Sequence, residues 1–311
     1  MSELTQRAGF VIEDNPYEVL YIDLTSRCNM VCNFCYNSSA GSGEDMDINY
    51  FEEVCQRLPR PVFMRFVGGE PALHPRFFDF IKIVRKYRHH VHFSSNGLVY
   101  NDDDFVRNLK SLNGQAAASM TMDGGCTGRN IYQEINGGDY LEQKLQAFEN
   151  LIRFDIKRVG LSALIARGVN EQIVPELLDL AERHKRNVRY IHFRTAAKVG
   201  RWVDTIPYSL EELKSLVGMH FSAEAFSPRC LNEIHCRPDE NRNCCYRFRP
   251  TNRLQISLIE FASDRSVECP KRGKLMDDFR VLPFFKQMIS PDQYNDTGSI
   301  RPDAEIQSVQ N

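Results

Sequence analysis

The sequence of 311 residues lacks the features that mark several common classes of protein. It has no apolar run long enough to cross a bilayer, no repeat of the solenoid kind, and no apolar core in residues 1–18, where a signal peptide would have one. The formal net charge is only -2, so nothing global marks a binder of nucleic acid or membrane. We therefore expect a cytoplasmic protein with reduced thiols and neither of those partners.

The composition also argues against a scaffold held together by disulfides. Its 10 cysteines are spread over 311 residues and are not packed into a short secreted chain. Hydrophobic residues make up 42% and charged residues 26%, which is typical of an ordinary globular protein with a large core.

Short apolar, β-branched runs alternate with helical patterns along most of the chain. The expected strands are residues 19–24, 62–67, 91–94, 116–122, 159–165 and 188–193. Apolar stripes at helical spacing lie between them, at residues 48–58, 77–84, 141–154 and 173–183. This alternation predicts an α/β fold with a parallel sheet wound by helices. The pattern alone leaves open whether the sheet is an open, doubly wound one or a barrel.

Three cysteines follow directly after the first expected strand. Cys28, Cys32 and Cys35 form a CxxxCxxC cluster, so three thiolates on one short loop can ligate one metal centre. A closed zinc site or a fully ligated iron-sulfur cluster needs four protein ligands, so three favour a cluster with one open iron. Zinc is the alternative, but zinc ribbons repeat a CxxC pair 15–20 residues on, and here the next cysteine is Cys55.

This spacing, with Phe34 just before the last cysteine, resembles the signature of the radical S-adenosylmethionine (radical SAM) superfamily. The resemblance implies a partial (β/α)6 barrel with a 4Fe-4S cluster on Cys28, Cys32 and Cys35, and S-adenosyl-L-methionine (SAM) at its open iron. It also implies reductive cleavage of SAM to methionine and a 5'-deoxyadenosyl radical that abstracts hydrogen from a C-H bond. The electron would come from a reducing partner such as flavodoxin or ferredoxin.

Unusual residues follow the other expected strands at their carboxyl ends, which in parallel β/α folds form one mouth. In the superfamily a GGEP-like segment binds the amino group of SAM. Ser94, Ser95 and Asn96 would bind the ribose of SAM, and Ser162 would face the nucleoside. Arg194 would bind the SAM carboxylate or the substrate. The expected cofactor-binding residues are Phe34, Gly68, Gly69, Glu70, Pro71, Ser94, Ser95, Asn96, Ser162 and Arg194, with Asp123 as a substrate contact. Each of these candidates also has a purely structural alternative. The glycine pairs and Asp123 could simply form turns, Asn96 and Gly97 could form a hairpin, Ser162 could lie in a buried strand, and Arg194 could be a surface arginine.

Five further cysteines lie within 40 residues near the C-terminus, interleaved with arginines. The segment resembles the small auxiliary-cluster modules called SPASM and twitch domains, which implies a second 4Fe-4S cluster. The expected ligands are Cys230, Cys236, Cys245 and Cys269. A structural zinc site and unligated thiols are the alternatives. The expected domains are a radical SAM core at 1–220, a cysteine-rich domain at 221–289, which begins after a helix headed by Ser209, and a flexible tail at 290–311.

The resemblance also narrows the expected substrate. Only about 18 residues precede the first strand, so we expect no leader-binding domain and a small-molecule substrate, such as a sugar or aminoglycoside that is epimerised or dehydrogenated. The alternatives are a leader-independent peptide maturase and a non-catalytic iron-sulfur or zinc protein. An epimerase must return a hydrogen atom to the substrate radical, and a free thiol is a suitable donor, for which Cys244, Cys245 and Cys126 are candidates.

Overall fold

Six parallel strands form the centre of the structure, a computed structural model that describes residues 9–112, 116–196, 201, 206–223, 225, 245–251, 253–260 and 272–283. They pair in chain order along one sheet. Each begins and ends within two residues of the range predicted from periodicity. The strands are β2 (Val19–Thr25), β3 (Phe63–Gly68), β4 (His90–Ser95), β5 (Ala116–Thr121), β6 (Val159–Ile165) and β7 (Val188–Thr195).

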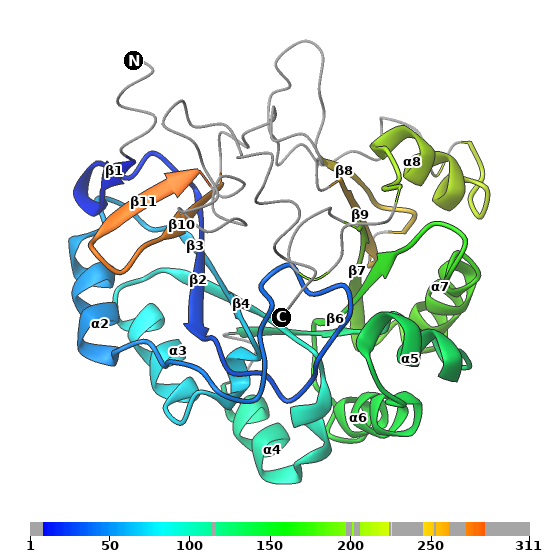
Figure 1. The fold of residues 1–311 in the computed structure, drawn as a ribbon, viewed down its shortest axis with the longest axis horizontal. Coiled ribbons are helices and arrows are strands. Elements are labelled where there is room, and N and C mark those ends of the chain that lie inside the picture. Colours follow the sequence, from blue (N-terminus) through cyan, green and yellow to red (C-terminus); the bar gives the residue numbers. More distant parts are fainter. Residues whose placement is uncertain are drawn as a thin grey trace.

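Helices connect the strands and cover the outer face of the curved sheet (Figure 1). The parallel sheet wound by helices is the predicted α/β fold, and its curvature is that of a partial barrel. The helices are α2 (Ile48–Arg57), α3 (Phe77–Lys86), α4 (Asp103–Ser111), α5 (Arg129–Asn136), α6 (Leu141–Arg153), α7 (Ile173–Arg183) and α8 (Leu210–Gly218). Short 3-10 turns are η1 (Ile12–Asp14), η2 (Pro71–Leu73) and η3 (Leu98–Asn101). Within the described ranges, no helix is long and apolar enough to span a membrane.

The sheet continues beyond the six strands at both edges. At one edge β9 (Gln255–Ile259) pairs parallel with β7, and β8 (Cys245–Phe248) pairs antiparallel with β9. At the other edge β10 (Arg272–Leu275) pairs parallel with β2, followed by β11 (Arg280–Pro283) and β1 (Phe10–Val11). The described strands of the segment predicted as a C-terminal domain therefore extend the central sheet. Whether residues 221–289 also form a domain with its own cluster stays a prediction.

Capping side chains fix where several helices begin. The carboxylate of Asp47 accepts the backbone N-H groups of Asn49 and Tyr50 at 2.9 and 2.8 Å, which starts α2. Asp102 caps α4 in the same way and accepts the backbone N-H groups of Asp104 and Phe105. The expected capping box between Ser209 and Glu212 starts α8.

The two faces of the sheet differ in character. Alternate strand residues point outward to the helices, where Phe66 meets Phe51 of α2 and Phe80 of α3, with ring centroids 5.8 and 6.3 Å away. Burying each such ring contributes about 1.5–3 kcal/mol. The residues between them point into the barrel, and many are polar. Tyr21, Arg65 and His92 lie side by side in register on β2, β3 and β4. Branched apolar side chains usually fill that position in a barrel.

Candidate functional site

A cavity of about 190 Å³ opens at the carboxyl ends of the strands. Its lining brings together most of the predicted site residues, from β2, β3, β4, β5 and β7 and the loops after them. They are Cys28, Cys32, Phe34, Cys35, Gly68, Gly69, Ser94, Ser95, Asn96, Asp123 and Arg194. The convergence expected from the strand ends is therefore present. Glu70, Pro71, Ser162 and Cys126 do not line this cavity.

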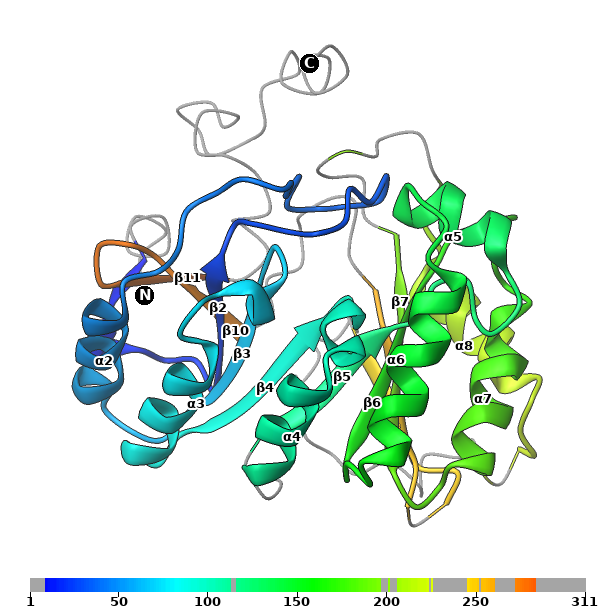
Figure 2. The same cartoon turned by 90° about the horizontal axis from the view of Figure 1, so that it is seen from below.

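The loop that carries the three cysteines lies over the strand ends (Figure 2). It is held from two sides. The backbone N-H groups of Asn33 and Phe34 donate to the carbonyl oxygen of Ile135 in α5, at 3.0 and 3.4 Å. The guanidinium of Arg201 donates to the carbonyl oxygens of Cys32 and Ser38, at 3.0 and 2.9 Å. Because the loop is anchored through its backbone, the thiols are free to face the cavity.

The three thiols have a donor set suited to an iron-sulfur cluster. They line one cavity and form no disulfide, and side-chain amides approach two of them. Asn96 Nδ2 lies 3.8 Å from Cys28 Sγ, and Asn136 Nδ2 lies 3.6 Å from Cys32 Sγ. Hydrogen bonds to cluster sulfurs tune the reduction potential. Burial raises the pKa of Cys28, and that of Cys32 to about 11, so both thiols need a bound cation to ionise at neutral pH.

The arrangement of side chains does not suit a site for a single metal ion. Within the described part of the chain, no three His, Cys, Asp or Glu side chains are placed to hold one metal ion. Each cysteine of a 4Fe-4S cluster binds its own iron, so cluster ligands need not converge on one point.

The glycine pair after β3 allows a close backbone contact. Gly68 has φ +111°, and a Cβ on Gly69 would overlap the carbonyl oxygen of Arg27. The N-H of Gly69 donates to the carbonyl oxygen of Thr25 at 2.8 Å, and that of Glu70 to Arg27 at 2.8 Å. The glycines therefore let the backbone after β3 pack closely against the start of the cysteine loop, and their contact with SAM stays a prediction.

Glu70 is buried between two loops, with an exposed fraction of 1%. Its oxygens accept the backbone N-H groups of Ala72 at 3.2 Å and Asn96 at 2.6 Å. Burial raises the pKa of this carboxyl to about 7. The carboxylate therefore joins the loop after β3 to the loop after β4. Its contact with the SAM ammonium stays a prediction.

Asp123 lies at the end of β5, with both carboxylate oxygens engaged. One accepts the side-chain amide of Asn136 at 2.9 Å, and the other accepts the backbone N-H of Leu164 at 2.8 Å. Asn136 in turn donates toward Cys32. Asp123 thus positions an amide beside Cys32, and its contact with substrate stays a prediction.

Lys144 of α6 is a site residue that the sequence reasoning missed. It is completely buried, and its ammonium donates to the carbonyl and hydroxyl oxygens of Thr121 at 3.0 and 3.1 Å and to the carbonyl oxygen of Asn96. Burial lowers its pKa, and the nearby carboxylate of Asp123 opposes this. A lysine inside the apolar stripe of residues 141–154 was the available signal. Asn136 and Arg65 were also missed, and nothing local in the sequence marks them.

The remaining candidates lie elsewhere. Ser162 is buried on β6, and Pro71 is the buried first residue of η2. Cys126 follows β5, where its N-H donates to Glu176 at 2.8 Å. Cys230, Cys236, Cys244 and Cys269 lie outside the described residues, as does the side chain of Cys245. Their roles stay predictions.

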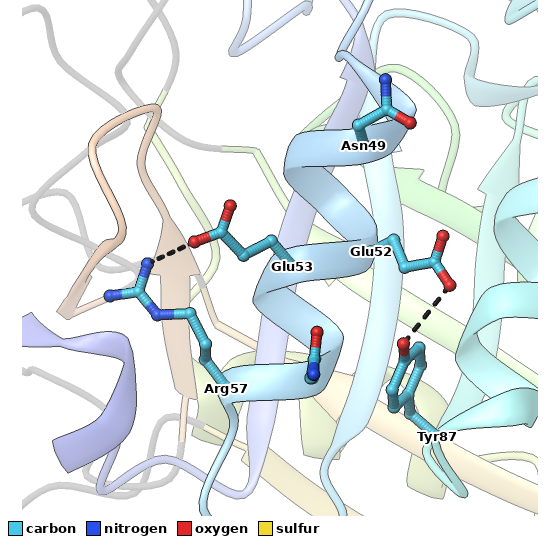
Figure 3. A pocket seen from close by; sticks show the side chains of 6 residues that line it. Asn49, Glu52, Glu53, Arg57 and Tyr87 are labelled. Carbon is cyan, nitrogen blue, oxygen red and sulfur yellow. Dashed lines mark hydrogen bonds and ion pairs between the residues drawn. The ribbon is translucent and has the colours of Figure 1, made fainter.

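A second depression lies on the outer side of α2 (Figure 3). Its charged groups all have ion-pair partners: Arg57 pairs with Glu53 at 2.9 Å, and Glu52 pairs with Lys86 at 2.6 Å. Its lining contains no thiol. The cavity with the cysteines is therefore the candidate site.

A curved α/β barrel with three thiols on the loop after its first central strand defines a class of enzymes that hold a metal cofactor at the mouth of the barrel. Residues 22–181, just over half of the chain, match the family described as the radical SAM superfamily. The chain belongs to this superfamily. Membership implies a 4Fe-4S cluster and SAM as cofactors, and radical chemistry as the reaction type. The match ends before the predicted SPASM/twitch region.

Several characterised proteins resemble this chain. The 7,8-dihydro-6-hydroxymethylpterin dimethyltransferase of Methanocaldococcus jannaschii is 26% identical over 187 residues, which are 58% of this chain and 36% of that protein. The GTP 3',8-cyclase of Chlorobaculum tepidum is 25% identical over 259 residues, 78% of this chain and 76% of that protein. This chain thus spans about a third of the first relative and three quarters of the second.

Solved structures show the same fold. The crystal structure of Streptococcus suis SuiB superposes with a TM-score of 0.62 at 13% identity, covering 91% of this chain and 63% of that one. At this identity the likeness concerns the fold alone.

Proposed function

We propose that this protein cleaves SAM reductively and abstracts a hydrogen atom from a C-H bond of a small molecule. The observation that carries the proposal is the shared cavity. Cys28, Cys32 and Cys35 line it together with Gly69 and the loop after β4, where the superfamily resemblance puts SAM. When bound, the cluster would supply the electron that cleaves SAM to methionine and a 5'-deoxyadenosyl radical.

The residues of the chain then have distinct tasks. Three thiolates hold the cluster, and the amides of Asn96 and Asn136 stabilise the thiolate charge. The loops after β3 and β4 would hold the amino-acid and ribose parts of SAM. A cavity of about 190 Å³ beneath an anchored loop limits the water around a radical.

A small substrate is favoured over a peptide. The names of two relatives refer to a pterin and to GTP. One structural neighbour, SuiB, was solved with a precursor peptide, so peptide maturation is the second candidate. Within small molecules we propose epimerisation or dehydrogenation, with a flavodoxin or ferredoxin as electron donor.

Anaerobic reconstitution tests the proposal. We expect wild-type protein with a reductant to convert SAM to 5'-deoxyadenosine, measured by chromatography. The variant with Cys28, Cys32 and Cys35 all replaced by Ala should form none. Cys55→Ala is the matched control, because Cys55 is a buried thiol of α2 outside the cavity, and it should keep the activity. Bound iron or zinc without 5'-deoxyadenosine would instead support the non-catalytic alternative.

Iron content of the same samples tests the auxiliary cluster. Two four-iron clusters predict about eight irons in the wild type and about four in the triple variant. A wild type with about four irons and a triple variant with none would contradict the second cluster. Zinc in the triple variant would identify the structural alternative.

A further inference from the structure

Two arginines point into the cavity without a carboxylate partner. Arg65 of β3 and Arg194 of β7 both line it, and the Nε atom of each is buried without a hydrogen-bond partner. Arg65 donates a hydrogen bond to the hydroxyl of Tyr21 at 3.3 Å, and its guanidinium carbon lies 5.6 Å from the centroid of that ring. Among the described residues, no acid forms an ion pair with either guanidinium. Both residues are half-buried, and a guanidinium partly removed from water without an ion-pair partner is suited to bind an anionic ligand.

Acidic side chains near the cavity are already engaged. Asp23 forms an ion pair with Lys274 at 2.6 Å. The oxygens of Asp123 are bound by Asn136 and Leu164, and those of Glu70 by backbone N-H groups. None of these three carboxylates is therefore available to neutralise the two arginines.

Arg65 is the deeper of the two arginines and lies beside two histidines. Arg65 lies three residues before Gly68 on β3, about 10 Å deeper along the strand. Its neighbour in register is His92, which is 4% exposed and has a hydrogen bond to neither ring nitrogen. The His192 ring lies 6.3 Å from it. Burial, and then the nearby Arg65, hold the pKa of both histidines well below the ordinary value, so both are neutral.

We propose that the substrate carries a phosphate or carboxylate group that Arg65 and Arg194 bind inside the barrel. This inference rests on the proposed function and narrows its substrate class. A guanidinium presents a planar fork of N-H donors that matches the oxygens of such anions. With the anion held between β3 and β7, the rest of the substrate extends toward the cysteine loop. A polycationic aminoglycoside is repelled by the same groups, so the substrate class shifts from amino sugars to acidic or phosphorylated molecules.

The carboxylate of SAM is also an oxyanion at the mouth of the barrel, so it could bind the same arginines in place of a substrate anion. Arg194 ends β7 next to the mouth, whereas Arg65 lies deeper. An experiment with SAM already bound separates the two sources.

The test measures binding of inorganic pyrophosphate by calorimetry to the reconstituted full chain saturated with SAM. We expect binding by the wild type, and a loss of roughly tenfold or more in affinity for Arg65→Met and Arg194→Met. Arg65→Lys keeps the charge without the fork and should fall between. Arg189→Met is the matched control, since Arg189 is half-buried on β7 outside the cavity, and it should bind like the wild type. Kanamycin should not compete.

Each other result has a defined meaning. Unchanged pyrophosphate affinity in Arg65→Met and Arg65→Lys overturns the site. If Arg194→Met loses SAM affinity and keeps pyrophosphate affinity, Arg194 serves SAM and the two-arginine site is wrong. The protein could also bind pyrophosphate through both arginines and yet form no 5'-deoxyadenosine. In that case the proposed function fails and the anion site is supported.

Discussion

Three buried side chains link the loops at the mouth of the barrel through hydrogen bonds. Glu70 links the loops after β3 and β4, Asp123 links β5 to β6 and α5, and Lys144 ties the loop after β4 to the end of β5. All three are almost fully buried. Buried charged groups are kept only where hydrogen bonds compensate the loss of water, so these residues position the loops that would bind the cofactor.

Glu70→Gln should weaken SAM binding about tenfold or more, because a charge-assisted hydrogen bond contributes about 1.5–3 kcal/mol. Equilibrium dialysis of SAM against cluster-loaded protein measures this. The pKa of Glu70, raised by burial to about 7, also predicts a pH dependence. Below that pH the carboxyl is protonated and cannot pair with an ammonium group, so wild-type affinity should fall as the pH drops below about 7.

The variant should show no such fall, because an amide does not titrate. Glu176→Gln is the control, since Glu176 binds Cys126 outside the cavity and should not affect SAM. Equal affinities of wild type and Glu70→Gln across the pH range would remove Glu70 from the SAM site.

At the scale of elements, α5 matters most for the site although periodicity did not predict it. Its Ile135 carbonyl accepts two N-H groups of the cysteine loop, and its last residue, Asn136, reaches Cys32. Gly137 then ends the helix at φ +73°, where a Cβ would overlap the carbonyl oxygen of Val31. One short helix therefore fixes the cysteine loop through both backbone and side chain.

Helix α2 plays a comparable part at the opposite edge of the sheet. The Tyr50 hydroxyl donates to the carbonyl oxygen of Met276 and accepts the N-H of Phe279 at 3.2 Å, in the turn between β10 and β11. Burial raises the pKa of Tyr50 to about 12, so the phenol stays a donor. Tyr50→Phe should lower the free energy of unfolding by about 1–2 kcal/mol, measured in urea, and leave the iron content unchanged.

The control for that helix is Tyr87→Phe. The Tyr87 hydroxyl bonds Glu52 on the outer surface (Figure 3), at 3.3 Å. Surface substitutions change stability by about 0.5 kcal/mol or less. Equal stabilities of the two variants would show that the contact between α2 and the β10–β11 turn contributes nothing.

On the scale of the whole molecule, one C-terminal segment covers both edges of the six-stranded sheet. β9 pairs with β7 and β10 pairs with β2, although few residues separate β9 from β10 in the chain. Exposed strand edges pair readily with other chains, so covering them protects against aggregation.

A chain shortened to end at residue 244 should therefore aggregate and lose cooperative unfolding, because β2 and β7 become edge strands. Size-exclusion chromatography and thermal unfolding measure both effects. A chain ending at residue 289 keeps every described strand and should behave like the full chain. A monomeric, cooperatively unfolding chain ending at 244 would show that the six strands suffice.

The sequence by itself determined the six central strands, most of the helices that cover them, and the kind of site. Strand and helix ranges follow from periodicity, because the side chains of each element alternate between core and solvent at the period of its own backbone. The cysteine spacing pointed to the cluster, since ligands on one loop are a local property. The strand ends carrying Gly69, Asn96 and Arg194 could be placed at one mouth, because parallel strands all point the same way.

Only the tertiary structure decided which distant groups meet. Asn136 comes to lie beside Cys32, and Arg65 faces the cavity from deep in β3. Glu70 itself does not line the cavity, and its carboxylate accepts the backbone N-H groups of Ala72 and Asn96. The sequence patterns also did not predict that β9 and β10 pair with opposite edges of the central sheet. Local patterns constrain the backbone within each element, whereas these contacts join segments far apart in the chain and depend on how the curved sheet and its helices pack together.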